Sequence, residues 1–332
     1  MNYIDTEVIE AHKIKIINHL NNLGIENIRK EIITGLTSKQ KTISSKFFYD
    51  KTGSKLFEDI TQLPEYYPTR TEKKILKTIA PKLMHNLRHA DIVELGSGDC
   101  SKISLLLNSI PKENLKTINY IPVDVSQSAV NESARNLVEK FPDLSIKGLV
   151  ADFINQLDLI PKTSKRMLCF LGSTLGNFTE TVTNQFLKNL SSSMNSGDTF
   201  LLGVDLVKST DILHDAYNDS QEVTAEFNKN ILNVINDLIN SDFNINDFEH
   251  KAFFNQGKSR IEMHLIANKD VIINTPFSTT TINLKKGENI HTENSYKFTQ
   301  AQINNFAKAS GLNIKEIFTD PNNWFALVLF EK

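Results

Sequence analysis

The sequence predicts an α/β fold with a mostly parallel central sheet, joined to a second and smaller α+β lobe. Between Ala90 and Leu206, short apolar runs alternate with amphipathic segments, as strands and helices do in a parallel sheet. The C-terminal tail returns to this pattern, whereas the interval before it has a different character. A length of 332 residues also suits two domains of ordinary size.

Seven strands are expected in the main sheet. Each is a short run rich in apolar residues, and the third is the weakest of them. The last two are joined by a turn at Asp320-Pro321, so they form an antiparallel hairpin that closes the sheet. The seven runs are Asp91–Leu95, Ile118–Val123, Ser145–Val150, Met167–Leu171, Thr199–Val204, Ile314–Phe318 and Phe325–Phe330.

The second lobe is expected to contain a long helix followed by extended segments. From Val223 to about Ile239, apolar residues recur on one stripe of a helix. Turns at Asn255–Gly257 and Lys285–Gly287 separate the extended segments that follow. The expected lobe is therefore a helix packed with a small sheet.

The N-terminal residues are expected to join the second lobe. They read as helical and carry an aromatic-rich stretch from Phe47 to Tyr67. The expected division is residues 75–206 and 298–332 for the main-sheet domain, and residues 1–74 and 207–297 for the second lobe.

The composition argues against several classes of protein. The formal net charge is −2 without any block of like charge, so no nucleic-acid partner is expected. Cys100, Cys169 and the eight histidines show no metal-ligand spacing, so no metal is expected. The sequence shows neither a signal peptide nor an apolar run long enough for a membrane span, which favours a cytoplasmic location.

A glycine turn follows the first strand of the main sheet. The segment Val93–Lys102 reads as a strand, a turn with Gly96 and Gly98, and the start of a helix. Glycine allows the backbone to approach a ligand closely, and a helix start offers free N–H groups. The alternative is a tight strand-to-helix turn that binds nothing.

Two acids end the next strands. Asp124 can accept hydrogen bonds from both hydroxyls of a ribose, or it can instead cap the helix that follows Ser126. Asp152 stands beside Phe153, and an acceptor next to an aromatic face suits an adenine ring. The alternative for Phe153 is packing in the core.

The choice of cofactor depends on the glycine loop and on the terminal hairpin. A loop that binds the dinucleotide NAD would need a third glycine at the position of Ser101, so its absence counts against NAD as the cofactor. The antiparallel hairpin is typical of class I S-adenosylmethionine-dependent methyltransferases, whose Rossmann-like seven-stranded sheet this part of the chain resembles. Their usual third glycine is absent here as well.

The fourth strand leads into Phe170–Asn177, at the edge of the sheet where ligands of doubly wound folds lie. Asn177 can donate and accept hydrogen bonds there. It can also simply cap the helix that begins near Thr179.

A closer resemblance extends from about Thr37 to the C-terminus. The chain is similar to the histidine-specific α-amino methyltransferases of ergothioneine biosynthesis. The stretches that carry this similarity are Lys46–Asp50, Leu63–Arg70, Val93–Gly98, Phe170–Asn177, Leu202–Lys208, Phe227–Leu232, Arg260–Met263 and Thr292–Phe298.

The resemblance implies methyl transfer from S-adenosylmethionine to the α-amino nitrogen of L-histidine, up to the trimethylated betaine hercynine. It implies S-adenosylhomocysteine as product, and the chemistry needs no dedicated catalytic base. A monomer is expected, although no sequence feature sets the oligomeric state. Together with the glycine loop, the resemblance implies cofactor contacts from Tyr49, Gly96, Gly98, Lys102, Asp124, Asp152 and Phe153. It implies substrate contacts from Phe57, Tyr66, Gly172, Asn177, Tyr217, Met263, Glu293 and Ser295.

The residues themselves support part of this assignment. Glu293 and Ser295 are two apart in an extended run, so both can meet a ring that offers a donor and an acceptor. Met263 can instead belong to a core face and Glu293 to a solvated strand, and Tyr66 and Tyr217 can be packing aromatics. Two other functions stay open: methylation of another amino acid or small amine, and a non-catalytic S-adenosylmethionine-binding module.

Overall fold

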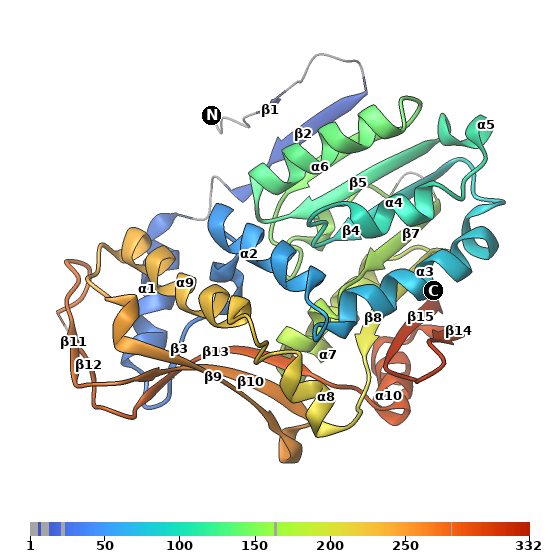
Figure 1. Cartoon of the computed structure of the whole chain (residues 1–332). Helices are drawn as coiled ribbons and strands as arrows, with labels where there is room; N and C mark the ends of the chain where they lie inside the picture. Colours follow the sequence, from blue (N-terminus) through green and yellow to red (C-terminus); the bar gives the residue numbers. More distant parts are fainter. Residues whose placement is uncertain (1–5, 8–12, 21–23, 163–164, 280) are drawn as a thin grey trace. The chain divides into compact units, whose positions relative to one another are not determined.

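The computed structural model describes residues 6–7, 13–20, 24–162, 165–279 and 281–332. The chain divides into two compact units (Figure 1). Unit 1 comprises residues 1–22, 68–206 and 298–332, and unit 2 comprises residues 23–67 and 207–297. Among the described residues, no helix combines the length and hydropathy of a membrane span.

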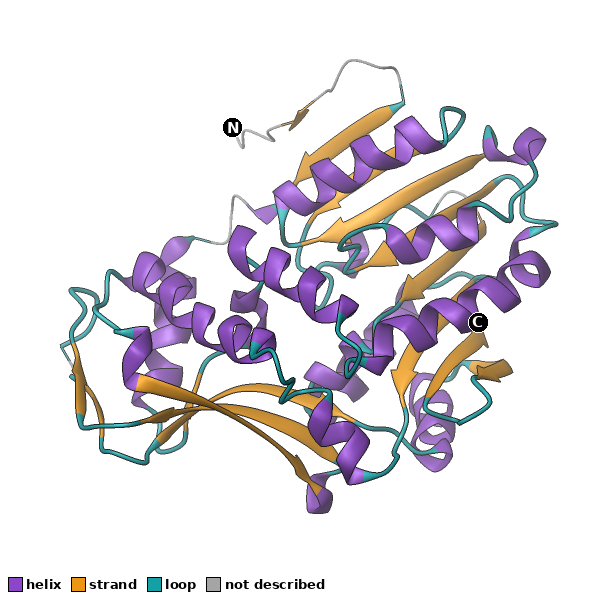
Figure 2. Cartoon of the chain, viewed as in Figure 1, coloured by secondary structure: helices purple, strands orange, loops and turns teal. Residues whose placement is uncertain are grey.

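Unit 1 is built on a large, mostly parallel sheet (Figure 2), which confirms the predicted fold class. Its order is β1-β2-β6-β5-β4-β7-β8-β15-β14 over the described residues. The strands are β1 (Thr6–Glu7), β2 (Ile14–Asn18), β4 (Ala90–Leu95), β5 (Ile118–Asp124), β6 (Ser145–Val150), β7 (Lys165–Phe170), β8 (Thr199–Asp205), β14 (Asn313–Thr319) and β15 (Phe325–Glu331).

All seven predicted strands are present, and β14 and β15 form the predicted antiparallel hairpin. The predicted strand count was too low, because β1 and β2 extend the sheet beyond β6. β2 runs parallel to β6 and buries Ile14 and Ile16 at this edge. The prediction that residues 1–74 are helical was therefore wrong for Ile14–Asn18, where buried Ile14 and Ile16 lie on either side of exposed Lys15, as in a strand.

The helices of unit 1 cover both faces of its sheet. Ile75 of α3, Ile103 of α4 and Leu137 of α6 share one core cluster with strand residues such as Ile92. On the other face, Phe186 of α7 packs against Phe170 of β7 with ring centroids 5.2 Å apart. The helices are α3 (Tyr67–Met84), α4 (Ser101–Leu107), α5 (Lys112–Leu115), α6 (Gln127–Lys140), α7 (Glu180–Ser193) and α10 (Gln300–Ser310), with 3-10 turns η3 (Leu157–Leu159) and η4 (Thr174–Asn177).

Unit 2 is an α+β lobe, as the sequence predicts. Its main sheet has the order β3-β13-β10-β9 within the described residues, and β11 and β12 form a separate pair. The strands are β3 (Lys41–Thr42), β9 (Phe248–Asn255), β10 (Arg260–Ala267), β11 (Val271–Ile273), β12 (Ile282–Leu284) and β13 (Asn289–Tyr296). The helices are α1 (Ile25–Thr37), α2 (Lys51–Gln62), α8 (Thr210–Asp215) and α9 (Val223–Ile239), with 3-10 turns η2 (Ser45–Phe48), η5 (Ile245–Asp247) and η6 (Gln256–Lys258).

The long helix α9 supplies the core of unit 2. Phe227, Ile231 and Ile235 form its buried stripe, as the apolar spacing predicts. α9 contacts α1, α2, β9 and β10. Its first residues thereby reach the strands on which several candidate site residues lie.

The boundaries between the units differ from the expected ones. The sequence analysis assigns residues 1–74 to the second lobe, whereas residues 1–22 and 68–74 belong to unit 1. The physical reasons are the pairing of β2 with β6 and the continuation of α3 from Tyr67 into unit 1. The two units also divide between residues 206 and 207 and between residues 297 and 298.

Candidate functional site

The glycine turn of unit 1 adopts a conformation that needs glycine. Gly96 and Gly98 have φ values of +67° and +49°, in the left-handed region. The Gly96 N–H donates to the Val123 carbonyl at 2.8 Å, which ties the turn to β5. A Cβ added to Gly98 would meet no described atom within 4 Å, so this backbone is open to a ligand.

Asp124 ends β5 and lies against the glycine turn. Its carboxylate accepts from the Ser126 N–H at 3.0 Å and, more distantly, from the Gly98 N–H at 3.5 Å. The helix α6 is capped by Ser126, whose hydroxyl accepts from Ala129, so the alternative that Asp124 is its N-cap is wrong. Burial raises the pKa of Asp124, while these backbone N–H groups oppose the rise.

Asp152 and Phe153 follow β6. The Asp152 carboxylate accepts from the Ile154 N–H at 2.9 Å and from the Asn155 amide at 2.7 Å, which fixes this turn. The Phe153 ring is partly exposed and packs edge-on against Phe170, with centroids 5.4 Å apart. A Cβ added to Gly96 would lie 3.7 Å from this ring, so Phe153 adjoins the glycine turn.

A buried acid, Glu72, connects two of the predicted site residues. It lies on α3, has no exposed surface, and its carboxylate accepts from the Gly172 N–H at 2.8 Å. The Lys102 ammonium lies 2.9 Å from the same carboxylate. Gly172 has φ +80°, and a Cβ there would lie 2.7 Å from the Lys102 nitrogen. Glu72 is not among the residues predicted from the sequence. Its position one helical turn before Ile75 places it on the same apolar face of α3, which indicates a buried acid.

Asn177 ends the 3-10 turn η4 after β7 and is partly exposed. The N-cap of α7 is Thr179, whose hydroxyl accepts from the Val182 N–H at 3.4 Å. The alternative that Asn177 caps this helix is therefore wrong. The candidate residues of unit 1 thus follow β4, β5, β6 and β7, all at the carboxyl ends of parallel strands.

The aromatic candidates of unit 2 form a connected cluster. Phe57 lies 5.8 Å from Tyr49 and 6.2 Å from Tyr66, measured between ring centroids. Tyr66 lies 6.2 Å from Tyr217, and Phe57 lies 5.9 Å from Phe227 of α9. Tyr49 belongs to unit 2, whereas the other predicted cofactor residues belong to unit 1.

Met263, Glu293 and Ser295 lie on one face of the sheet of unit 2. In the β10–β13 register, Met263 is opposite Glu293 and Ile261 is opposite Ser295, so their side chains share a face. The Tyr217 hydroxyl donates to the Ser295 hydroxyl at 2.7 Å. Burial raises the pKa of Glu293 to about 7, and the positive charge of Lys297 opposes that rise.

A β-bulge at Thr292 sets this register. Met263 pairs with Glu293 and His264 pairs with His291, so Thr292 has no paired residue on β10. Its buried hydroxyl lies 2.7 Å from the Asn228 side-chain oxygen and 3.0 Å from the Met263 carbonyl. The bulge therefore places His291 and Glu293 on opposite faces although they are two residues apart.

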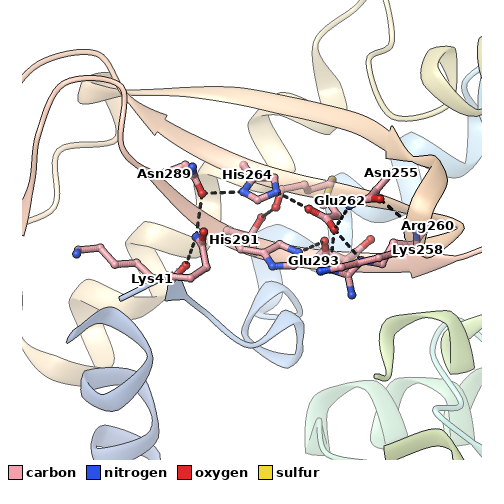
Figure 3. A network of polar contacts seen from close by, with 12 residues as sticks. Lys41, Asn255, Lys258, Arg260, Glu262, His264, Asn289, His291 and Glu293 are labelled. Carbon is pink, nitrogen blue, oxygen red and sulfur yellow. Dashed lines mark hydrogen bonds and ion pairs between the residues drawn. The ribbon is translucent and has the colours of Figure 1, made fainter. Parts of the chain in front are cut away.

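The other face of the same strands carries a polar network (Figure 3). The carboxylate of Glu262 accepts from the Arg260 guanidinium at 2.6 Å and lies 3.2 Å from the His264 ring. Burial alone would raise the pKa of Glu262, but these two partners lower it to about 2. His291 stacks on His264 with centroids 4.6 Å apart, and burial beside His264 lowers the pKa of His291 to about 4.

Glu262, His264 and His291 also have metal-ligating atoms within 4.8 Å of one another. The sequence alone does not predict this cluster, because His264 and His291 come from different strands and become neighbours only through the register of β10 and β13. Two features favour a structural role: the imidazole planes are within 13° of parallel, so their nitrogens do not converge on one point, and Arg260 already occupies the carboxylate. The expectation of no metal stays a prediction.

Comparison with known proteins gives a consistent result. The family described as "Histidine-specific methyltransferase, SAM-dependent" matches residues 28–332. A histidine N-alpha-methyltransferase of Mycolicibacterium smegmatis is 37% identical over 92% of this chain and 94% of its own length. A protein of the same name from Mycobacterium tuberculosis is 36% identical over 96% of this chain and 100% of its own. Ergothioneine biosynthesis protein 1 of Schizosaccharomyces pombe is 26% identical over 71% of this chain, which spans 32% of that protein.

Proposed function

The chain belongs to the histidine-specific, S-adenosylmethionine-dependent methyltransferases, and from this premise we propose how its two units divide the work. It transfers a methyl group from S-adenosylmethionine to the α-amino nitrogen of L-histidine, in ergothioneine biosynthesis, with S-adenosylhomocysteine as the second product. Unit 1 is proposed to bind the methyl donor. Unit 2 is proposed to supply most of the contacts with the amino acid.

The turn and acids of unit 1 fit a nucleoside. Gly98 leaves its backbone uncovered, Asp124 offers carboxylate oxygens beside it, and the ring of Phe153 adjoins the same turn. We therefore assign Gly96, Gly98 and Lys102 to the amino acid part of the donor and its surroundings. Asp124 would accept from the ribose, and Asp152 with Phe153 would hold the adenine. Tyr49 of unit 2 is proposed to complete this set.

Unit 2 offers a donor and an acceptor on one face, which suits an imidazole ring. Glu293 would accept from one ring nitrogen, and Ser295 would bond the other, with Met263 and Tyr66 against the ring. Tyr217 and Asn177 are proposed to hold the carboxylate of the substrate, with Gly172 and Phe57 near its amine. The observation that carries this proposal is the shared face of Glu293 and Ser295, joined to Tyr217 by a 2.7 Å hydrogen bond.

The chemistry makes modest demands on these side chains. S-adenosylmethionine supplies a methyl group that its sulfonium already activates, so the protein has to align the amine and exclude water. An α-amino group has a pKa of roughly 8 in model peptides, so loss of its proton to solvent suffices. No side chain is assigned as a dedicated base. Clamping the carboxylate and the ring leaves the amine free to rotate between successive methylations up to hercynine.

Mass spectrometry of the reaction mixture tests the function directly. With histidine and S-adenosylmethionine, we expect singly, doubly and triply methylated histidine together with S-adenosylhomocysteine. Parallel reactions with the other free amino acids test the alternative acceptors. Equal turnover of several amino acids would contradict histidine specificity, and no product with any of them would support the non-catalytic alternative.

The remaining expectations concern surroundings and assembly. A monomeric state, a cytoplasmic location and the lack of a nucleic-acid or membrane partner stay predictions. Light scattering coupled to size exclusion tests the first of these, with a mass of 37.6 kDa expected for the monomer.

A further inference from the structure

A buried lysine lies behind the proposed substrate site. Lys297 directly follows β13, and none of its surface is exposed to solvent. Its ammonium is 2.8 Å from the Ser295 hydroxyl oxygen and 3.1 Å from that of Tyr217. Fully buried lysines are rare because the charge loses its water, so this ammonium depends on such partners.

The backbone of Lys297 is fixed by a neighbouring turn. Its N–H donates to the Ser259 carbonyl at 2.8 Å, and its carbonyl accepts from the Ser259 hydroxyl at 2.9 Å. Ser259 has φ +52° and lies between η6 and β10. The turn before β10 therefore fixes the backbone from which the Lys297 side chain extends.

The three groups can be hydrogen-bonded in only a few ways, because an ammonium donates and never accepts. Lys297 donates to Ser295 and to Tyr217, and the Tyr217 hydroxyl donates to Ser295 at 2.7 Å. The Ser295 oxygen thus accepts from Lys297 whether the single Tyr217 proton is directed to Ser295 or, in the proposed complex, to the substrate carboxylate. Because the ammonium cannot accept the Ser295 proton, that proton is available to a ring nitrogen.

We propose that Lys297 is a specificity-determining residue that fixes Ser295 as a hydrogen-bond donor, so that Glu293 and Ser295 together select a neutral imidazole ring. A neutral imidazole has one N–H, which matches the Glu293 carboxylate, and one lone pair, which matches the Ser295 proton. An imidazolium has two N–H groups and a positive charge, and it would meet both the Ser295 proton and the Lys297 ammonium. This inference rests on the proposed function, in which the ring contacts Glu293 and Ser295.

The charge of Lys297 also favours recognition of a neutral ring through its effect on Glu293. Burial favours the protonated form of Glu293, and the charge of Lys297 opposes this and favours the carboxylate, which is the form that can only accept hydrogen bonds. Lys297 acts through Glu293 and Ser295 and is therefore a positioning residue.

The test is a double-mutant cycle with Lys297→Met and Ser295→Ala. Met keeps the length and apolar character of the lysine stem but has no charge and no N–H. We expect the KM for histidine to rise about tenfold in Lys297→Met, with a smaller change in kcat and unchanged affinity for S-adenosylhomocysteine. In the Ser295→Ala background, adding Lys297→Met is expected to raise the KM clearly less than in the wild-type background, because the Ser295 donor is already lost and only the effect on Glu293 remains.

Two further variants separate this role from a structural one. Lys297→Gln keeps an N–H donor without the charge, so its KM for histidine is expected to lie between that of the wild type and that of Lys297→Met. If Lys297→Met is too unstable to assay, Lys297→Gln is compared with the wild type directly. Lys208→Met is the matched control, because its ammonium is bonded to the Tyr67 hydroxyl at 2.8 Å elsewhere in unit 2. We expect its KM for histidine to stay near that of the wild type.

The outcomes distinguish this inference from the proposed function. Wild-type protein that makes no S-adenosylhomocysteine from histidine would contradict the proposed function itself. Active wild-type protein would contradict only the role of Lys297 if Lys297→Met kept the wild-type KM, or if its effect persisted in full in the Ser295→Ala background.

Discussion

The Glu72 carboxylate lies against the backbone of Gly172, whose N–H is 2.8 and 3.0 Å from its two oxygens. The same carboxylate is ion-paired with Lys102 at 2.9 Å. One buried acid on α3 therefore holds the turn after β7 and the first turn of α4 in a single network. Two predicted site residues, Gly172 and Lys102, are positioned by a residue that no sequence motif singled out.

Replacing Glu72 tests this network. Glu72→Gln keeps an acceptor for Gly172 but removes the charge opposite Lys102, so we expect a loss of about 1–3 kcal/mol in the free energy of unfolding, measured with urea. Glu316→Gln is the control, because its exposed pair with Lys82 contributes less than about 1 kcal/mol. Equal effects of the two variants would contradict the positioning role of Glu72.

Gly203 of β8 makes room for the same carboxylate. A Cβ there would lie 2.3 Å from Glu72 Oε1, a distance that forces one of the two residues to move. Gly203→Ala is expected to destabilise the protein by about 1–3 kcal/mol and to slow methyl transfer. At Gly257 an added Cβ would be 3.6 Å from its nearest neighbour, so Gly257→Ala should unfold like the wild type. Wild-type behaviour of both would reject this steric account.

Glu293 is the sharpest test of ring recognition. A carboxylate that accepts from a ring N–H contributes about 1.5–3 kcal/mol, so Glu293→Ala should lower kcat/KM for histidine roughly tenfold to a hundredfold. Binding of S-adenosylmethionine should persist, as titration calorimetry can show. Glu249→Ala, at an exposed position of β9, serves as the control. Unchanged histidine kinetics in Glu293→Ala would exclude the proposed contact.

The pH dependence of stability should report a second buried acid. Burial raises the pKa of Glu94 on β4 to about 8, although the Tyr120 hydroxyl, 2.5 Å away, opposes the rise. The unfolded acid titrates near 4.5, so the unfolded chain releases a proton that the folded protein keeps. Stability therefore falls as the pH rises from about 4.5 to about 8.

Glu94→Gln removes this titration. Between about pH 5 and about pH 8 its Tm should fall less than that of the wild type, measured by differential scanning calorimetry. Glu293 contributes in the same direction, because its pKa is also raised, so part of the slope should remain. A variant with the full wild-type slope would show that Glu94 does not stay protonated in the folded protein.

The sequence could predict what depends on local pattern. Seven of the nine described strands of the main sheet are short runs rich in apolar residues, and the apolar stripe of α9 repeats with the helical period, so the sequence predicts both. β2 was missed because it has only five residues, and the consecutive Ile16 and Ile17 break the alternation of apolar and polar positions that marks a strand. Its pairing with β6 has no local signal, because the paired residues are 132 positions apart, as in Ile14 and Ile146.

The candidate site likewise has a part that a local sequence pattern predicts and a part that depends on contacts between distant residues. The turn at Gly96 and Gly98 is a local feature, and the sequence placed it correctly at the end of a strand. The partners of Glu72 and Lys297 come from other elements, so their importance emerges only when the chain is folded. A buried charge is identified by its surroundings, which the residue type alone does not reveal.

The unpaired Thr292 has a consequence for how such a protein can diversify. Because Thr292 is the extra residue of the bulge, deleting it would leave His291 opposite His264 and Glu293 opposite Met263 in a regular ladder. Deleting the paired residue Asn294 would instead bring Ser295 opposite Glu262 and turn its side chain to the face of Arg260, while Glu293 would keep its face. In the proposed site, acceptor preference is therefore expected to depend on the length of β13 as well as on substitutions.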